Sequence, residues 1–254
     1  MAGTNKPRTV EAVQTTLDII EVLRQRESAG VTELASELGR SKGTVHSHLA
    51  TLLENEYIIK REDGYRLSLR YLDLGETVKN RISGYEVVTS EIDALAEKSG
   101  ELAQFATHEH GRVVYLYKSG GENAVQTASS IGKREFMHRI SLGKAMLAFM
   151  PEDRVNAIVD KHGLPTSTDN TIATRSELHE NLAEIRERGY AFDEEEKIKG
   201  VRCAAVPITA NGEIFGAISV SGPSTRMDGE WYREELPDML TRSANVIEIN
   251  TKFA

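Results

Sequence analysis

Apolar residues recur at helical spacing through the first part of the chain. They predict a helix over residues 9–27, which packs on two further helices within residues 32–53 and carries Val10, Val13, Leu17, Ile20 and Leu23. Gly39 separates the two later helices, because a glycine accepts the positive φ that a sharp turn requires, and Ser41 is placed to cap the second of them. In that second helix Val45, Leu49 and Leu52 repeat at i, i+4 and i+7, which predicts one buried face.

The pattern changes to strands after residue 56. Tyr57, Ile58 and Ile59 predict one strand, residues 65–69 predict a second by alternation, and Asp63-Gly64 predicts the tight turn between them. Three helices followed by a two-stranded hairpin have the order of a winged helix-turn-helix, which binds DNA. An ordinary helical hairpin is the alternative, but it leaves the strands unexplained.

The side chains predicted to contact DNA are small, basic or hydrogen-bonding. The first turn and exposed face of the second hairpin helix carry no large hydrophobic residue, as entry into a major groove requires. The candidates there are Ser41, Lys42, Gly43, Thr44, His46 and Ser47. Lys60, Arg61 and Arg66 flank the turn of the hairpin and are candidate phosphate contacts.

Residues 70–99 predict two more helices, and we place a domain boundary near residue 80, between an N-terminal domain of residues 1–80 and a C-terminal domain of residues 81–254. Strands are predicted at 101–119 (a hairpin around Gly111), 190–192, 201–208 and 213–221, helices at 142–149, from Pro151, at 175–188 and at 229–250, and loops at 120–135 and 163–174. This order predicts an α+β protein, in which a winged helix-turn-helix precedes a central antiparallel sheet with helices on its faces.

Composition narrows the functional classes. The 254 residues carry a net charge of −8, which argues against nonspecific coating of nucleic acid. Positive and negative charges are nearly balanced over residues 1–75, so phosphate contacts must come from a few placed residues. One cysteine, no signal peptide and no membrane-spanning apolar run predict a cytoplasmic protein without a disulfide framework. Residues 1–8 are predicted to form a tail.

Catalytic and metal-binding patterns are weak. Gly143-Lys144 lacks the following Ser or Thr of a phosphate loop, and His108 and His110 share a strand face without an evident third ligand. The acidic run at residues 193–196 reads as a solvated surface, except that Asp193 ends an apolar strand and can point inward. We therefore predict no enzymatic activity, cofactor or metal.

Residues 200–222 give a more specific signal. Ser219 and Ser221 share one face of an apolar strand, so with Cys203 and Asp193 they predict the wall of a small polar pocket. Backbone N–H groups near Ser141, at the start of a helix, are further donors. The alternatives remain a sheet face that merely packs on a helix, and for Cys203 either an inert buried thiol or a reactive one beside Arg202.

The chain resembles the IclR family of transcriptional regulators along nearly its whole length. The matching stretches are TELASELGRSKGTVHSHLATL at 32–52, YIIKREDGYRLS, LDLGE, HRISLGKAMLAFMP at 138–151, RERGYAFDEEEKIKGVRCAAVPI at 186–208 and GAISVSGPSTR at 216–226. The resemblance implies a homodimer or tetramer that binds operator DNA through Lys42, Thr44, His46 and Ser47. It also implies a GAF-like domain that binds a small organic effector, commonly a carboxylate, a sugar catabolite or an aromatic compound, through Ser141, Leu142, Asp193, Cys203, Ser219 and Ser221.

Three positions depart from the family pattern. Ser47 stands where the family often has Arg, and His48 stands where an apolar residue is usual, so the operator or the role of the hairpin differs. Ser141-Leu142 replaces a pair of small residues, which narrows the predicted pocket. We predict a sequence-specific transcriptional regulator controlled by an effector. The alternatives are a sensor or enzyme whose hairpin helices only dimerise, and a DNA-binding protein with a purely structural C-terminal domain.

Overall fold

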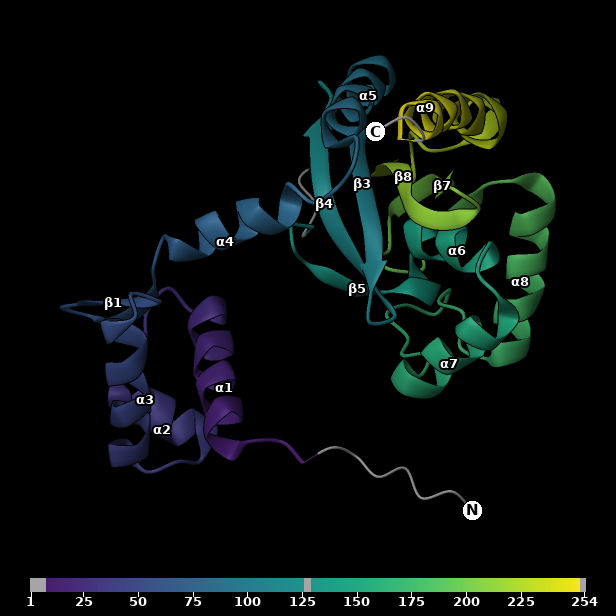
Figure 1. Cartoon of the computed structure of the whole chain (residues 1–254). Coiled ribbons are helices and arrows are strands. Elements are labelled where there is room, and N and C mark those ends of the chain that lie inside the picture. Colours follow the sequence, from purple (N-terminus) through teal and green to yellow (C-terminus); the bar gives the residue numbers. More distant parts are fainter. Residues whose placement is uncertain (1–7, 126–128, 252–254) are drawn as a thin grey trace. The chain divides into compact units, whose positions relative to one another are not determined.

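The computed structural model describes residues 8–125 and 129–251, which divide between Arg81 and Ile82 into two compact units (Figure 1). The predicted N-terminal tail lies outside the described residues except for Arg8. None of the helices in the described ranges has the length and apolar content needed to cross a bilayer.

The first unit is a winged helix-turn-helix, as predicted. Its elements are α1 (Glu11–Gln25), α2 (Val31–Leu38), α3 (Lys42–Glu54), β1 (Ile58–Arg61), β2 (Gly64–Leu67) and α4 (Arg70–Lys79). Gly39 ends α2 with φ of 60°, and the Ser41 hydroxyl caps α3 by accepting a hydrogen bond from the Thr44 N–H at 3.1 Å. These local features fix the turn between the two helices.

The face of α1 that packs on its neighbours is the predicted one only in part: Leu23 is buried and Ile20 packs against the core, as predicted, but the other three predicted residues do not. The buried residues are Thr15, Ile19, Val22 and Leu23. Val10, Val13 and Leu17 stay 64%, 55% and 53% exposed. Helical spacing identifies an apolar face, but α1 has two of them on opposite sides, and spacing does not say which one the domain covers.

The turn of the hairpin lies one residue earlier than predicted. Arg61 pairs with Gly64, so Glu62 and Asp63 form the loop and Gly64 begins β2. Gly64 has φ of 132°, and a Cβ there would lie 2.8 Å from the carbonyl oxygen of Ala29. The glycine therefore serves a close approach of two backbones as well as the turn.

The second unit is built on a six-stranded antiparallel sheet in the order β5-β4-β3-β8-β7-β6. Its elements are α5 (Tyr85–Ser99), β3 (Leu102–Glu109), β4 (Arg112–Gly120), β5 (Arg134–Phe136), a 3-10 turn (Met137–Arg139), α6 (Ser141–Ala148), α7 (Glu152–His162), α8 (Arg175–Arg188), β6 (Ala191–Glu194), β7 (Val201–Ala210), β8 (Glu213–Pro223), a π-helical turn (Trp231–Glu235) and α9 (Leu236–Thr251). Helices α5 and α9 cover one face, and α6, α7 and α8 cover the other (Figure 1). The predicted α+β fold is confirmed.

Two details of this unit differ from the prediction. Strand β5 ends the segment predicted as a loop, because three residues are too few to show a period of two. The last helix begins with a π turn before α9 continues it. The two predicted hairpin turns, between β3 and β4 and between β7 and β8, are confirmed. Their turn residues have the positive φ that such turns require: 78° at Gly111, 54° at Asn211 and 80° at Gly212.

Candidate functional site

The candidate DNA-contacting residues of α3 are gathered on one exposed surface. The N-terminal turn begins at the Ser41 cap, where the Ser41 and Thr44 hydroxyl oxygens lie 2.8 Å apart. Val45, Leu49 and Leu52 are buried behind this turn. The exposed residues are Ser41, Lys42, Gly43, Thr44, His46 and Ser47. The turn therefore presents a lysine, three hydroxyl groups, an imidazole and a helix N-terminus, which are groups that bind phosphates and base edges.

His48 does not belong to this surface. Its Nδ1 lies 2.8 Å from the Thr16 hydroxyl on α1, and the side chain is partly buried. The residue that departs from the family pattern thus joins α3 to α1 through a hydrogen bond.

The three basic residues of the hairpin differ in their availability. Lys60 and Arg61 are exposed, and the Lys60 ammonium lies 5.8 Å from the centre of the Tyr65 ring. Arg66 pairs with Asp63 at 2.5 Å, and the Arg66 side chain holds the pKa of the Asp63 carboxyl below its usual range. Arg66 must therefore exchange one carboxylate for a phosphate if it binds DNA, whereas Lys60 and Arg61 need not.

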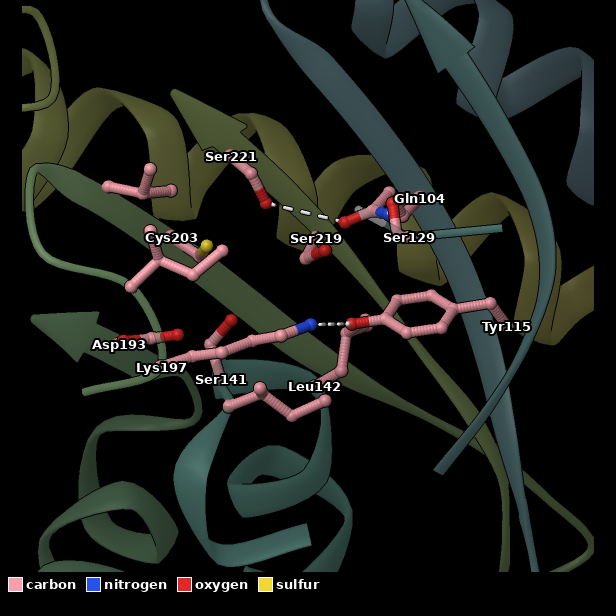
Figure 2. Close-up of a pocket in the computed structure, with 13 residues that line it drawn as sticks. Gln104, Tyr115, Ser129, Ser141, Leu142, Asp193, Lys197, Cys203, Ser219 and Ser221 are labelled. Carbon is pink, nitrogen blue, oxygen red and sulfur yellow. Dashed lines mark hydrogen bonds between the residues drawn. The ribbon is translucent and has the colours of Figure 1, made fainter. Parts of the chain in front are cut away.

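In the second unit, the six predicted effector-binding residues line a single cavity (Figure 2). The cavity has about 420 Å³ of empty space, part of it open to solvent, and its enclosed part is narrow. The six residues are Ser141 and Leu142 at the start of α6, Asp193 on β6, Cys203 on β7, and Ser219 and Ser221 on β8.

Strand register explains why these residues meet. Asp193 lies directly opposite Cys203, and Cys203 lies opposite Ser221, so the three form a row across β6, β7 and β8. Ser219 lies two residues from Ser221 and opposite Gln104 of β3. Opposed residues share a sheet face, so the row becomes the wall of the cavity.

Four further polar residues line the cavity and were not predicted from the sequence: Gln104, Tyr115, Ser129 and Lys197. Tyr115 lies on β4 and Lys197 on the loop between β6 and β7, far apart in the sequence. No local spacing links them. Only the pairing of β3 with β8, which joins segments more than a hundred residues apart, brings Gln104 to Ser219.

Asp193 has an unusual electrostatic environment. The residue is 2% exposed, and its Oδ1 accepts a hydrogen bond from the Glu196 N–H at 2.8 Å. Burial, with a smaller contribution from the Glu196 carboxylate, raises the pKa of Asp193 to about 7, while Lys144 opposes the shift. A carboxyl that is partly protonated at neutral pH can donate as well as accept a hydrogen bond in the cavity.

Two other cavity groups are relevant to ligand binding. Burial raises the pKa of the Cys203 thiol, and the neighbouring Asp193 adds to this effect, which favours the inert thiol over the reactive one.

The Ser219 hydroxyl is buried and has no hydrogen-bond partner among residues 8–125 and 129–251. Since buried polar groups are normally paired, this hydroxyl is suited to bind a ligand or a water molecule.

The raised pKa of Asp193 predicts a pH-dependent stability. Between pH 4 and 7 the native state holds a proton on Asp193 that the unfolded chain releases, so this residue's contribution to stability is present at low pH and lost as the pH rises through about 7. In wild type the free energy of unfolding should fall by roughly 1 kcal/mol per pH unit between pH 5 and 7 because of Asp193, and Asp193→Asn should remove this decrease. The measurement is urea unfolding at a series of fixed pH values. Asp169→Asn is the control, because Lys199 lowers the pKa of the exposed Asp169 and this carboxyl therefore stays ionised between pH 5 and 7. Parallel pH profiles for wild type and Asp193→Asn would contradict the assignment.

Within the described residues, no three His, Cys, Asp or Glu side chains are arranged to hold a metal ion. His110 has φ of 53° in the turn after β3, so it does not continue the alternation that was expected to align it with His108.

Comparison with known proteins agrees with this architecture. The family model described as "Bacterial transcriptional regulator IclR C-terminal" matches residues 80–249, and that described as "IclR helix-turn-helix domain" matches residues 12–62. The chain is 31% identical over its whole length to a protein of Halobacterium salinarum named "Probable HTH-type transcriptional regulator ArcR", of which it covers 98%.

Solved structures agree as well. The crystal structure of Thermotoga maritima IclR matches with a TM-score of 0.78 at 25% identity, over 95% of this chain and 99% of that one. A homologue from Microbacterium hydrocarbonoxydans, solved in complex with 4-hydroxybenzoate, matches with a TM-score of 0.82 at 21% identity, over 96% of this chain and 100% of that one. Because the identity to the Microbacterium hydrocarbonoxydans homologue is only 21%, this similarity shows the fold alone.

Proposed function

The chain belongs to the IclR family of transcriptional regulators, and on this premise we propose that it binds a specific operator as a homodimer or tetramer, under the control of a small organic acid bound in the cavity of its C-terminal domain. Members of the family are regulators rather than enzymes, so the chain is a DNA-binding regulator with an effector domain. The proposal adds the operator contacts, the effector site and the class of effector.

The observation that carries the proposal is the convergence of Asp193, Cys203, Ser219 and Ser221 on one cavity that contains an unpaired buried hydroxyl. A sheet face that only packs on a helix has no need of such a group. The structural homologue bound to 4-hydroxybenzoate supports an organic acid as the ligand. A ligand that prefers one arrangement of the subunits would change the spacing of the two α3 helices and so the affinity for the operator.

The test is fluorescence anisotropy of the full chain with DNA from upstream of its own gene, against scrambled DNA of equal length. It is run at two salt concentrations, with and without a pool of small carboxylates and sugar acids. We expect preference for the upstream DNA, and we expect the pool to change it. No preference would favour the alternative of a sensor without operator binding, and preference that no acid changes would favour a structural C-terminal domain.

The exposed apolar face of α1 is proposed to join two subunits. Leu17 is 53% exposed between charged and polar neighbours, so roughly half of its side chain remains to be buried. In a two-fold dimer a substitution acts twice, and Leu17→Ser should weaken dimerisation by roughly 2–3 kcal/mol, or about 30- to 150-fold in Kd, measured by sedimentation equilibrium. Thr32→Ser, on the exposed side of α2, is the control. Unchanged association of Leu17→Ser would place the interface elsewhere.

A further inference from the structure

Lys197 reaches across the cavity (Figure 2). Its side chain is 17% exposed, and its Nζ lies 3.3 Å from the hydroxyl oxygen of Tyr115. Among the lining residues that the structure describes, Lys197 has the one cationic side chain and Asp193 the one acidic side chain. The charge of a ligand is therefore matched or opposed mainly by these two residues.

The loop that carries Lys197 is held firmly in place. The preceding residue, Glu196, is paired through its carboxylate with the buried Lys144, and its N–H donates to Asp193 at 2.8 Å. The carbonyl oxygen of Glu196 accepts a hydrogen bond from the Thr171 hydroxyl at 2.5 Å. Because the neighbouring Glu196 is held through its N–H, its carbonyl oxygen and its carboxylate, the backbone that carries Lys197 loses little conformational freedom on binding.

The ammonium already has a carboxylate partner that it can exchange. Lys197 Nζ lies 3.2 Å from Glu135 Oε1, and Arg139 Nη2 lies 2.5 Å from Glu135 Oε2. Burial alone would raise the pKa of Glu135, but Lys197 and Arg139 outweigh it and hold the pKa below its usual range. If Lys197 turns to a ligand carboxylate, Glu135 stays paired with Arg139, so the exchange leaves neither carboxylate buried and unpaired.

The other polar groups of the cavity are neutral. The Ser221 hydroxyl donates to Gln104 Oε1 at 3.4 Å, and Gln104 Nε2 donates to the Ser129 hydroxyl at 2.7 Å. With the unpaired Ser219 hydroxyl, these groups suit a hydroxyl or carbonyl oxygen. They provide no countercharge for a second carboxylate, which would be desolvated at a high cost.

We propose that Lys197 makes this cavity selective for small monocarboxylates, by binding the ligand carboxylate in exchange for Glu135 while the Tyr115 hydroxyl acts as a second donor. This inference rests on the proposed function, since it concerns the same effector cavity. It assigns the charge selectivity to a loop residue that lies outside the row of Asp193, Cys203 and Ser221. It also distinguishes monocarboxylates from dicarboxylates and from neutral analogues.

The test compares acids with their uncharged amides by isothermal titration calorimetry. The probes are lactate and lactamide, 4-hydroxybenzoate and 4-hydroxybenzamide, and succinate as a dicarboxylate. We expect wild type to prefer at least one monocarboxylate over its amide and over succinate. Lys197→Met should bind that acid about 10- to 100-fold more weakly, which is the loss expected for one hydrogen bond to a charged group. Its affinity for the amide should change little.

The control is Lys199→Met, two residues along the same loop, where the lysine is 73% exposed and pairs with Asp169 instead of lining the cavity. It should bind all probes as wild type does. Tyr115→Phe keeps the cation and removes one donor, so it should weaken acid binding about 3- to 10-fold. This second variant tests the site even if Lys197→Met disturbs the cavity.

Equal affinity of wild type and Lys197→Met for the acid would overturn the proposal, and so would tighter binding of succinate or binding of neither monocarboxylate. Operator binding by wild type is measured in parallel by anisotropy. Operator binding with none of the expected acid selectivity would leave the regulator intact and reject the role of Lys197. Absence of operator binding would instead reject the proposed function.

Discussion

Lys144→Met is expected to destabilise the C-terminal unit by about 3–5 kcal/mol. Lys144 is 1% exposed, and its ammonium pairs with the Glu196 carboxylate, itself 6% exposed. Removing the cation leaves a buried carboxylate without its countercharge, close to Asp193, and Glu196 Oε2 already has no hydrogen-bond partner among the described residues. The loss is therefore far larger than for a surface ion pair.

The measurement is urea unfolding of the full chain followed by the fluorescence of Trp231, the single tryptophan, which lies in the C-terminal unit. Lys199→Met is the matched control, because it removes an exposed ion pair with Asp169 and should leave the free energy of unfolding nearly unchanged. The double variant Lys144→Met, Glu196→Leu should recover most of the loss, since it removes both charges together. Similar losses in the two single variants would show that the buried pair contributes no more than a surface one.

This pair also shows where the sequence stops being informative. The acidic run at residues 193–196 was predicted to be solvated except for Asp193, yet Glu196 is buried as well. Its partner is 52 residues away, so the local run of charges contains no sign of it. Gly143-Lys144 is explained in the same way: a Cβ on Gly143 would lie 2.2 Å from the Met137 carbonyl oxygen, and Lys144 is turned into the core. Neither residue serves a phosphate.

Periodicity predicted most helices and strands because their burial repeats along the chain. It could not choose between the two apolar faces of α1, where Leu17 is exposed and Ile19 is buried. It placed Ser219 and Ser221 on one face because they are two residues apart on one strand. It could not place Lys197 or Tyr115 in the cavity, because their positions depend on a loop and on strand pairings that no local pattern encodes.

Replacing Lys42 and Thr44 together by alanine should weaken operator binding by roughly 4 kcal/mol or more, about a thousandfold. Both side chains are exposed in the first turn of α3. Loss of a base-edge contact at Thr44 costs about 1–3 kcal/mol, loss of a phosphate contact at Lys42 adds to this, and in a dimer each substitution occurs at both half-sites. The matched control is Thr51→Ala with Lys161→Ala, which removes the same two residue types at the far end of α3 and on α7.

The single variants separate the two roles by anisotropy. Lys42→Ala should weaken binding to operator and scrambled DNA alike and reduce the slope of log K against log salt by about 2, one lost phosphate contact in each half-site. Thr44→Ala should weaken only the operator complex and leave the slope unchanged, because a base contact releases no counterion. Since neither residue lines the cavity, thermal stabilisation by an acid that stabilises wild type should persist in both. Operator affinity equal to that of the control variant would mean that α3 does not enter the groove through its first turn.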